Sequence, residues 1–211
     1  MSTGEETVRL DRRTGGRLVE HTRAIVGAAA RGDSPPDPPE LSVLKEERGV
    51  FVTLKRDGEL RGCIGRPRPE GALAEALEAA AIDAATSDPR FPPLSPEEIG
   101  DVAISVSVLT PPESLPTLDP DAIEVGRDGL IVSKGRRSGL LLPQVAVDRG
   151  WTATEFLRAT ARKAGLRPDA WRAEEVTVKR FSAQVFAEES PGGPVTLEDY
   201  TRNLASERST D

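Results

Sequence analysis

The sequence has few of the residues that disulfide-bonded folds and structural metal sites require. Its 211 residues include one cysteine, Cys63, and one histidine, His21. One cysteine cannot form an intramolecular disulfide, and one Cys with one His cannot supply the four ligands of a structural zinc site. We therefore predict no metal site, and the composition identifies no cofactor.

Long hydrophobic runs and an excess of positive charge are also missing. No apolar run approaches the roughly 20 residues that a membrane helix needs, and the first twenty residues have no apolar signal core. We therefore predict a cytoplasmic protein that does not enter a membrane. The 28 Lys and Arg residues against 35 Asp and Glu residues give a net charge of −7, which argues against nucleic acid as a partner, although a local basic pocket is compatible with it.

The remaining composition is that of a globular protein, with 37% hydrophobic and 30% charged residues. Apolar spacing predicts helices over residues 16–31 and 72–86, and an Asp-Gly turn at 57–58 predicts a β-hairpin. Hairpins with helices between them are typical of an α+β fold with mainly antiparallel sheets. The last strand region, residues 176–186, changes its apolar phase, which predicts a bulge near residues 179–180 or two strands.

The segment of residues 60–65 is the strongest candidate for chemistry. Alternate side chains of a strand share a face, so Arg61 and Cys63 are expected to project together. A neighbouring guanidinium favours the thiolate, and Gly62 and Gly65 leave room for a ligand to approach. The pattern predicts an activated nucleophile at Cys63. The alternative is a small, inert cysteine packed in a glycine-relieved strand.

Two further segments are candidates for binding an anion. Three prolines restrict the loop of residues 88–93, so Arg90 is expected to be presented to a carboxylate or phosphate; alternatively it pairs with Asp88 and closes the loop. Gln144 lies where a strand leads into a helix, whose free N–H groups could bind an anion; alternatively this is an ordinary helix start. The basic tip of residues 134–137 is typical of a solvated hairpin end.

Four segments in order carry a resemblance to a known family: Arg-Gly-Cys-Ile-Gly at 61–65, Asp-Pro-Arg-Phe-Pro-Pro-Leu at 88–94, Gly-Leu-Leu-Leu-Pro-Gln-Val at 139–145, and Lys-Ala-Gly-Leu at 163–166 with Trp171. They closely resemble the AMMECR domain family, whose prokaryotic members are called AmmeMemoRadiSam system protein A. The resemblance covers residues 14–188, with a flexible N-terminus at 1–13 and a polar C-terminal tail at 189–211. It implies two interleaved α+β subdomains, the smaller one around residues 110–150.

The resemblance also implies a Memo-like protein and a radical SAM enzyme as partners, but it supplies no reaction. Many relatives carry a second cysteine before the Lys-Ala-Gly-Leu segment, where this chain has Ala-Thr-Ala-Arg at 159–162, so a mechanism with two thiols is in doubt here. We expect a component of the AmmeMemoRadiSam system that acts on an unidentified substrate through Cys63. The alternative is a non-catalytic module that binds a small anion or a protein, with Cys63 structural.

Overall fold

A computed structural model describes residues 9–68, 71–115 and 119–198 of the chain. The fold is α+β with antiparallel strand pairing, as the sequence predicts. The chain divides into two compact units, each described here by itself. Unit 1 comprises residues 1–109 and 184–198, and unit 2 includes residues 110–183. Unit 2 is therefore longer than the smaller subdomain expected at 110–150.

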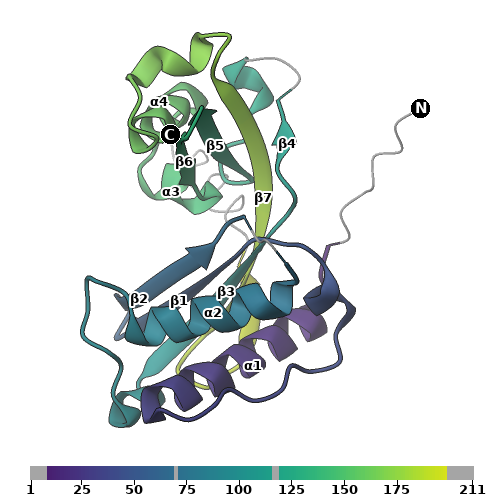
Figure 1. Cartoon of the computed structure of the whole chain (residues 1–211), viewed down its shortest axis with the longest axis vertical. Coiled ribbons are helices and arrows are strands. Elements are labelled where there is room, and N and C mark those ends of the chain that lie inside the picture. Colours follow the sequence, from purple (N-terminus) through teal and green to yellow (C-terminus); the bar gives the residue numbers. More distant parts are fainter. Residues whose placement is uncertain (1–8, 69–70, 116–118, 199–211) are drawn as a thin grey trace, which may run out of the picture. The chain divides into compact units, whose positions relative to one another are not determined.

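Unit 1 combines two long helices with a sheet (Figure 1). Its elements are α1 (Arg12–Arg31), η1 (Ser42–Lys45), β1 (Val50–Arg56), β2 (Glu59–Arg66), α2 (Leu73–Thr86), η2 (Pro96–Gly100), β3 (Val102–Leu109) and β8 (Val195–Glu198). The strand order is β2-β1-β3, followed by the C-terminal half of β7 (Thr177–Glu188), which also pairs with β8. Strand β2 is therefore an edge strand.

One hairpin turn and one helix cap explain two features of the local structure of unit 1. Asp57 and Gly58 both have positive φ angles, 51° and 81°, as the predicted two-residue hairpin turn requires. Helix α1 begins at Arg12 and not at residue 16, because the side chain of Asp11 accepts a hydrogen bond from the Thr14 amide at 2.7 Å. Part of the expected flexible N-terminus is thus helical, and residues 1–8 lie outside the described residues.

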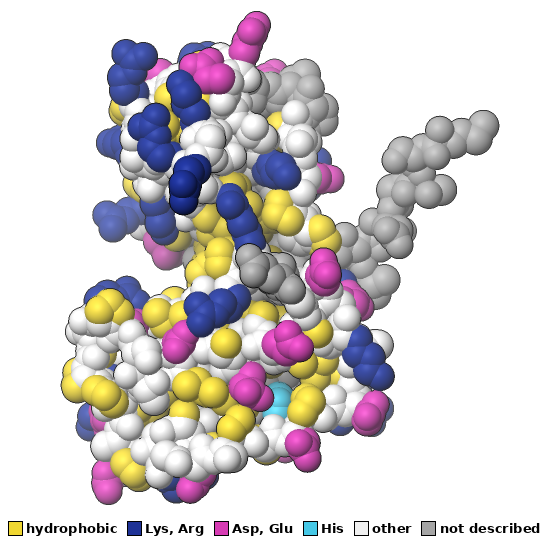
Figure 2. All heavy atoms as spheres, in the orientation of Figure 1, with side chains coloured by type: hydrophobic (Ala, Val, Ile, Leu, Met, Phe, Trp, Pro, Cys, Tyr) yellow, Lys and Arg dark blue, Asp and Glu magenta, His cyan; other side chains and the backbone are white. Residues whose placement is uncertain are grey.

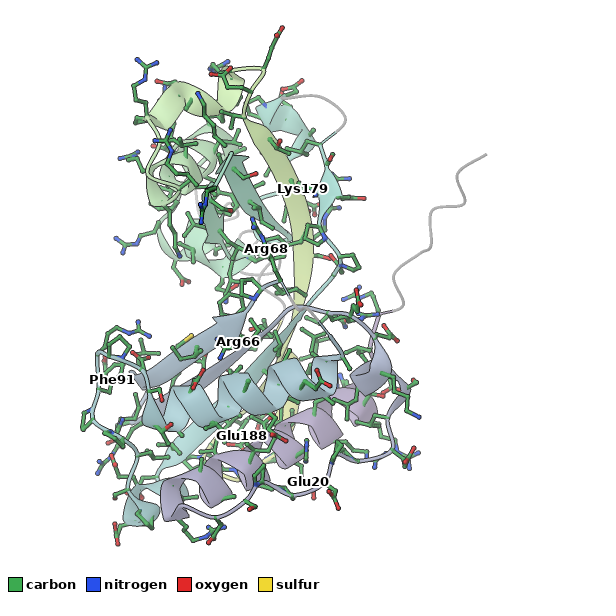
Figure 3. All side chains as sticks on the ribbon, in the orientation of Figure 1. Glu20, Arg66, Arg68, Phe91, Lys179 and Glu188 are labelled. Atoms are coloured by element: carbon green, nitrogen blue, oxygen red, sulfur yellow. The ribbon has the colours of Figure 1, made fainter. Side chains whose placement is uncertain are left out.

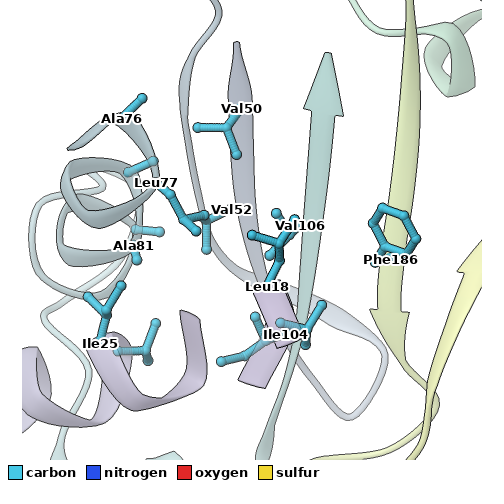
Figure 4. Packing of buried hydrophobic residues seen from close by; sticks show 14 of the residues in the cluster. Leu18, Ile25, Val50, Val52, Ala76, Leu77, Ala81, Ile104, Val106 and Phe186 are labelled. Carbon is cyan, nitrogen blue, oxygen red and sulfur yellow. The ribbon is translucent and has the colours of Figure 1, made fainter. Parts of the chain in front are cut away.

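The core of unit 1 lies between its helices and one face of its sheet, and it is mostly aliphatic (Figure 4). Buried Glu188 ties three elements together, because its carboxylate accepts hydrogen bonds from Arg23 of α1 at 2.6 Å and from the Ile104 amide of β3 at 2.9 Å. Glu188 is labelled in Figure 3. A buried carboxylate with this many donors meets the usual requirement for burying charge.

Unit 2 has a smaller sheet and a core with two large aromatic side chains, Phe156 and Trp171. Its elements are β4 (Glu113–Ser114), η3 (Pro120–Ala122), β5 (Asp128–Lys134), β6 (Arg137–Leu141), α3 (Pro143–Asp148), α4 (Ala153–Lys163), η4 (Pro168–Arg172) and the N-terminal half of β7. The strand order is β6-β5-β7, and β4 also pairs with β7.

Strand β7 corrects the prediction of a bulge or of two strands. It is one strand of 12 residues, and its pairing with β5 keeps its register from Thr177 to Ser182. The apolar phase changes because the strand serves two cores: Val178 belongs to the core of unit 2 and Phe186 to the core of unit 1. Within the expected polar C-terminal tail, Val195–Glu198 forms strand β8, and residues 199–211 lie outside the described residues.

Candidate functional site

Cys63 lies at the middle of the edge strand β2, with its side chain on the sheet face that points away from α2. Its neighbour Gly62 faces α2, because a Cβ atom there would lie 2.2 Å from the carbonyl oxygen of Ala84. Side chains alternate along a strand, so Arg61 and Cys63 share the opposite face, as the sequence predicts. The Cys63 side chain is half-buried, and the hydroxyl of Thr53 on β1 donates a hydrogen bond to its Sγ at 3.3 Å.

Asp88 and Arg90 hold the main chain of Cys63 from the outer side of β2. The carboxylate of Asp88 accepts a hydrogen bond from the Cys63 amide at 2.8 Å, and Nη2 of Arg90 donates to the Cys63 carbonyl oxygen at 3.2 Å. The Asp88 carboxylate and the Arg90 guanidinium thus bind the amide and the carbonyl oxygen of Cys63, which would otherwise be free to pair with a further strand. We call this pair of residues the edge clamp.

The two residues of the edge clamp also bind each other. Arg90 donates from Nε to Oδ1 of Asp88 at 2.9 Å and from Nη2 to Oδ2 at 2.7 Å. These bonds and the Cys63 amide hold the pKa of Asp88 well below its usual range. Asp88 is buried, with 2% of its side chain exposed, whereas 53% of the Arg90 side chain is exposed. In the edge clamp, Asp88 is therefore buried in the protein and Arg90 is open to solvent.

Arg90 is also the cation that contacts Cys63. Its pKa is raised chiefly by the Asp88 carboxylate, and Cys63 adds a smaller contribution of the same sign. The alternative that the sequence left open for Arg90, pairing with Asp88, is what the structure contains, together with the bond to Cys63. Its predicted role in substrate binding stays a prediction, supported by its exposed side chain.

Arg61 makes its hydrogen bonds to a different carboxylate. Its Nε and Nη2 donate to the two oxygens of Glu98 at 3.0 and 2.9 Å, and Nη1 donates to the carbonyl oxygen of Pro92 at 3.0 Å. Arg61 holds the pKa of Glu98 down at about 2. Only 12% of the Arg61 side chain is exposed. Arg61 therefore holds the segment that follows α2. The expected action of Arg61 on the thiol stays a prediction.

The two glycines beside Cys63 are covered by the chain itself. A Cβ atom on Gly62 would collide with the main chain of α2 at Ala84, and one on Gly65 would lie 2.2 Å from the ring of Phe51. Phe51 and Gly65 are cross-strand partners, so the ring lies over the glycine of the neighbouring strand. Close packing within unit 1 accounts for both glycines, and their expected role in ligand approach stays a prediction.

Gln144 lies in unit 2, in the first turn of the six-residue helix α3. Its Oε1 is buried and accepts no hydrogen bond from any described residue. Of the predicted site residues, the structure therefore brings Arg61, Gly62, Cys63, Gly65 and Arg90 together around β2, and Gln144 belongs to the other unit.

Sequence reasoning missed the contributions of Thr53 and Glu98 to this site, and it considered Asp88 only as a partner of Arg90. The pairing of Thr53 with Cys63 depends on the hairpin register, which includes a shift between Leu54 and Lys55. Glu98 forms a capping box with Ser95 at the start of η2. That the same carboxylate also binds Arg61, 37 residues earlier, is a tertiary contact without a local signal.

The site contains groups for acid–base, thiol and anion chemistry but no evident metal centre. Within residues 9–68, 71–115 and 119–198, no group of three His, Cys, Asp or Glu residues is placed to hold a metal ion. His21 lies on α1, where burial lowers its pKa. In the same part of the chain, no helix combines the length and the apolar character needed to cross a bilayer.

Comparisons with known proteins agree on one family. The model of the AMMECR1 family matches residues 19–186. A protein of Methanopyrus kandleri is 48% identical, over 99% of this chain and 97% of its own length, and a protein of Methanothermobacter thermautotrophicus is 51% identical, over 85% and 97%. The crystal structure of an uncharacterized protein from Pyrococcus horikoshii matches with a TM-score of 0.82 and 46% identity, covering 90% of this chain and 98% of that one.

Proposed function

Because the chain belongs to the AMMECR1 family, we propose that it is a component of the AmmeMemoRadiSam system, which meets its substrate at Cys63. In this proposal it works with a Memo-like protein and a radical SAM enzyme. The observation that carries the proposal is the position of the thiol: Cys63 is the one cysteine of the chain, it is half-buried and not sealed, and the edge clamp fixes its main chain.

The surroundings of Cys63 favour a negatively charged group at the sulfur. The Thr53 hydroxyl donates to Sγ, and the half-exposed Arg90 guanidinium lies beside the same residue. A hydrogen-bond donor and a nearby cation both stabilise an anion. The same two groups would orient an anionic substrate that approaches the thiol from solvent.

Alkylation with iodoacetamide tests this proposal, because the chain has a single thiol to modify. The thiolate sulfur bonds to the reagent carbon, iodide leaves, and the proton released earlier from the thiol stays with the buffer. At about pH 7 we expect Arg90→Ala to slow alkylation several-fold, because the reacting thiolate loses a nearby cation.

The matched control is Arg66→Ala on the same strand. Arg66 is exposed and pairs with Asp83 of α2, so its removal takes away the same charge without touching Cys63. This control should alkylate as the wild type does. Equal alkylation rates in all three proteins would show that Arg90 does not activate the thiol, and the chemical proposal would fail.

A second candidate function is a non-catalytic binding module in which Cys63 is structural. The observation that favours it is that other residues of the chain occupy the space around β2. Ala84 and Phe51 lie against Gly62 and Gly65. Arg61 donates its hydrogen bonds to Glu98. Pull-down of the Memo-like and radical SAM proteins with wild type and with Cys63→Ala separates the two functions. If the wild type and Cys63→Ala capture the partner proteins equally and the thiol is not activated, the binding module is supported. If neither partner protein is captured at any ratio, the result counts against both functions.

A further inference from the structure

The two units differ strongly in charge. The segments of unit 1, residues 1–109 and 184–198, contain 14 Lys and Arg against 22 Asp and Glu, a net charge of −8. Residues 110–183 of unit 2 contain 12 Lys and Arg against 10 Asp and Glu, a net charge of +2. The acidic character of the whole chain therefore does not extend to residues 110–183.

Five of the 12 basic residues in 110–183 come from one place, where the tip of the β5–β6 hairpin meets the C-terminal end of α4. Nη1 of Arg137 donates to the carbonyl oxygen of Gly165 at 3.2 Å. Nearby on β6, Gly139 packs directly on the main chain of α4, with a Cβ position 2.4 Å from the amide nitrogen of Ala164. These contacts place side by side the segments that carry five exposed cations. We call them the α4 basic patch: Arg136, Arg137, Arg162, Lys163 and Arg167.

No carboxylate among the described residues pairs with any member of this patch. The acidic residues that form ion pairs in this region are already engaged, since Glu175 binds Lys134 at 2.7 Å and Asp169 binds Arg158 at 2.9 Å. Figure 2 shows Lys and Arg side chains gathered over the α4 side of unit 2. The patch is therefore a cluster of uncompensated positive charge.

Stabilisation of the helix end does not account for this cluster. The C-terminus of a helix carries the equivalent of roughly −0.5 charge, which one nearby cation balances. Arg162 and Lys163 lie in the last turn of α4, but Arg136, Arg137 and Arg167 come from other segments. About four positive charges remain without a partner, and holding them together costs repulsion that an anionic partner would relieve.

We propose that the α4 basic patch docks an acidic segment of a partner protein. A discrete cluster of five cations matches a short run of Asp and Glu. Nucleic acid fits less well, because three of the four described aromatic side chains of unit 2, Phe156, Trp171 and Phe181, are buried, and the fourth, Trp151, is partly buried against the same core. A long polyanion is also repelled by the net charge of −8 on unit 1 of the same chain.

Binding of a labelled ten-residue glutamate peptide to the full chain tests the proposal. Fluorescence anisotropy at 50 mM and 200 mM salt should show binding that weakens as salt rises. The triple variant Arg136→Ala, Lys163→Ala, Arg167→Ala should bind the peptide at least tenfold more weakly. These three residues are exposed and their side chains make no hydrogen bond with a described residue, so the variant should keep the wild-type circular dichroism.

A matched control removes three exposed positive charges from unit 1: Arg9→Ala, Arg12→Ala, Lys55→Ala. This variant should bind the peptide as the wild type does, which supports a localised patch. Equal weakening by both triple variants would assign the binding to net charge and overturn the proposal. So would an absence of binding at 50 mM salt, or tighter binding of a ten-nucleotide single-stranded DNA than of the peptide, which would indicate a nucleic-acid surface.

Discussion

The two units solve the same packing problem in the same way. Each has a hairpin whose outer strand carries a glycine pressed against the C-terminal end of a helix, Gly62 on Ala84 of α2 and Gly139 on Ala164 of α4. Each also has a glycine beneath a phenylalanine ring of the neighbouring strand, Gly65 beneath Phe51 and Gly129 beneath Phe181.

The units differ in what they do with their arginines. On and beside β2 of unit 1, Arg61, Arg66 and Arg90 each bind a carboxylate, on Glu98, Asp83 and Asp88. At the equivalent edge of unit 2, the α4 basic patch has no carboxylate partner among the described residues. The comparison indicates that Arg61 and Arg90 of unit 1 build the surroundings of Cys63, whereas the cations of the α4 basic patch have no carboxylate partner among the described residues and can bind an external one.

The largest effect is expected from variants that disrupt the packing of a strand glycine on a helix, which both units share. Gly62→Ala and Gly139→Ala each place a Cβ atom within 2.4 Å of helix main chain, which cannot move as a side chain can. We expect each variant to lose about 3 kcal/mol of unfolding free energy, measured by urea denaturation. Gly16→Ala is the control, because a Cβ there meets no atom within 4 Å and alanine favours the helix. A loss below about 1 kcal/mol at either strand glycine would contradict the shared packing.

The next effect separates the units at the edge clamp. Asp88→Ala removes the buried carboxylate that accepts from the Cys63 amide and from Arg90, and it leaves that amide unpaired. We expect a loss of roughly 2 kcal/mol in unfolding free energy. Asp33→Ala should cost less than about 0.5 kcal/mol, because Asp33 is exposed and its pair with Arg31 lies in solvent. Equal losses in the two variants would show that the clamp is no stronger than a surface pair.

A smaller effect depends on pH and concerns Glu98. Its pKa in the folded protein is about 2, below the ordinary 4.5, because Arg61 donates to it. A depressed pKa adds stability above pH 4.5, and that stability is lost as the pH falls toward 2. Between pH 6 and pH 2 we expect the wild type to lose about 1–2 kcal/mol more than Glu98→Gln, after allowance for screening of this partly exposed pair.

Urea unfolding at several pH values measures this difference. Glu47→Gln serves as the control, since Glu47 is an exposed carboxylate that contacts no described cation. If Glu98→Gln loses as much stability as the wild type across this pH range, the Arg61–Glu98 pair does not contribute as the geometry indicates.

The smallest effect sharpens the contrast between the arginines of the two units. The triple variant at Arg136, Lys163 and Arg167 should change the unfolding free energy by no more than about 0.5 kcal/mol, or raise it, because these cations repel one another and bind no carboxylate. Thermal unfolding at low and high salt measures this. A loss above about 1 kcal/mol that disappears in high salt would show that the patch is paired within the protein.

Local signals in the sequence predicted much of the fold. The Asp-Gly turn at residues 57–58 and the helix expected over residues 72–86 are both confirmed, because each depends on residues close in sequence. The change of apolar phase in β7 was recognised, but its interpretation as a bulge was wrong. The two halves of the strand pack in different cores, which shifts the apolar positions in the same way that a bulge would.

The site was predictable in its residue types and less so in its partners. The strand period placed Arg61 and Cys63 on one face, but the carboxylate that binds Arg61 is 37 residues away in the chain. The glycines stood out as unusual, yet the sequence could not show that Ala84 and Phe51 occupy the space they leave. Contacts of this kind depend on register and helix position, which no local pattern encodes.

Hydrogen exchange at the Cys63 amide tests the edge clamp most directly. An outward-facing amide on an edge strand exchanges quickly unless something binds it, and here Asp88 accepts its hydrogen bond at 2.8 Å. We predict slow exchange in the wild type and in Asp33→Ala, and exchange at least tenfold faster in Asp88→Ala. Exchange in the wild type at the rate of a free amide, or a rate that a folded Asp88→Ala variant leaves unchanged, would contradict the clamp.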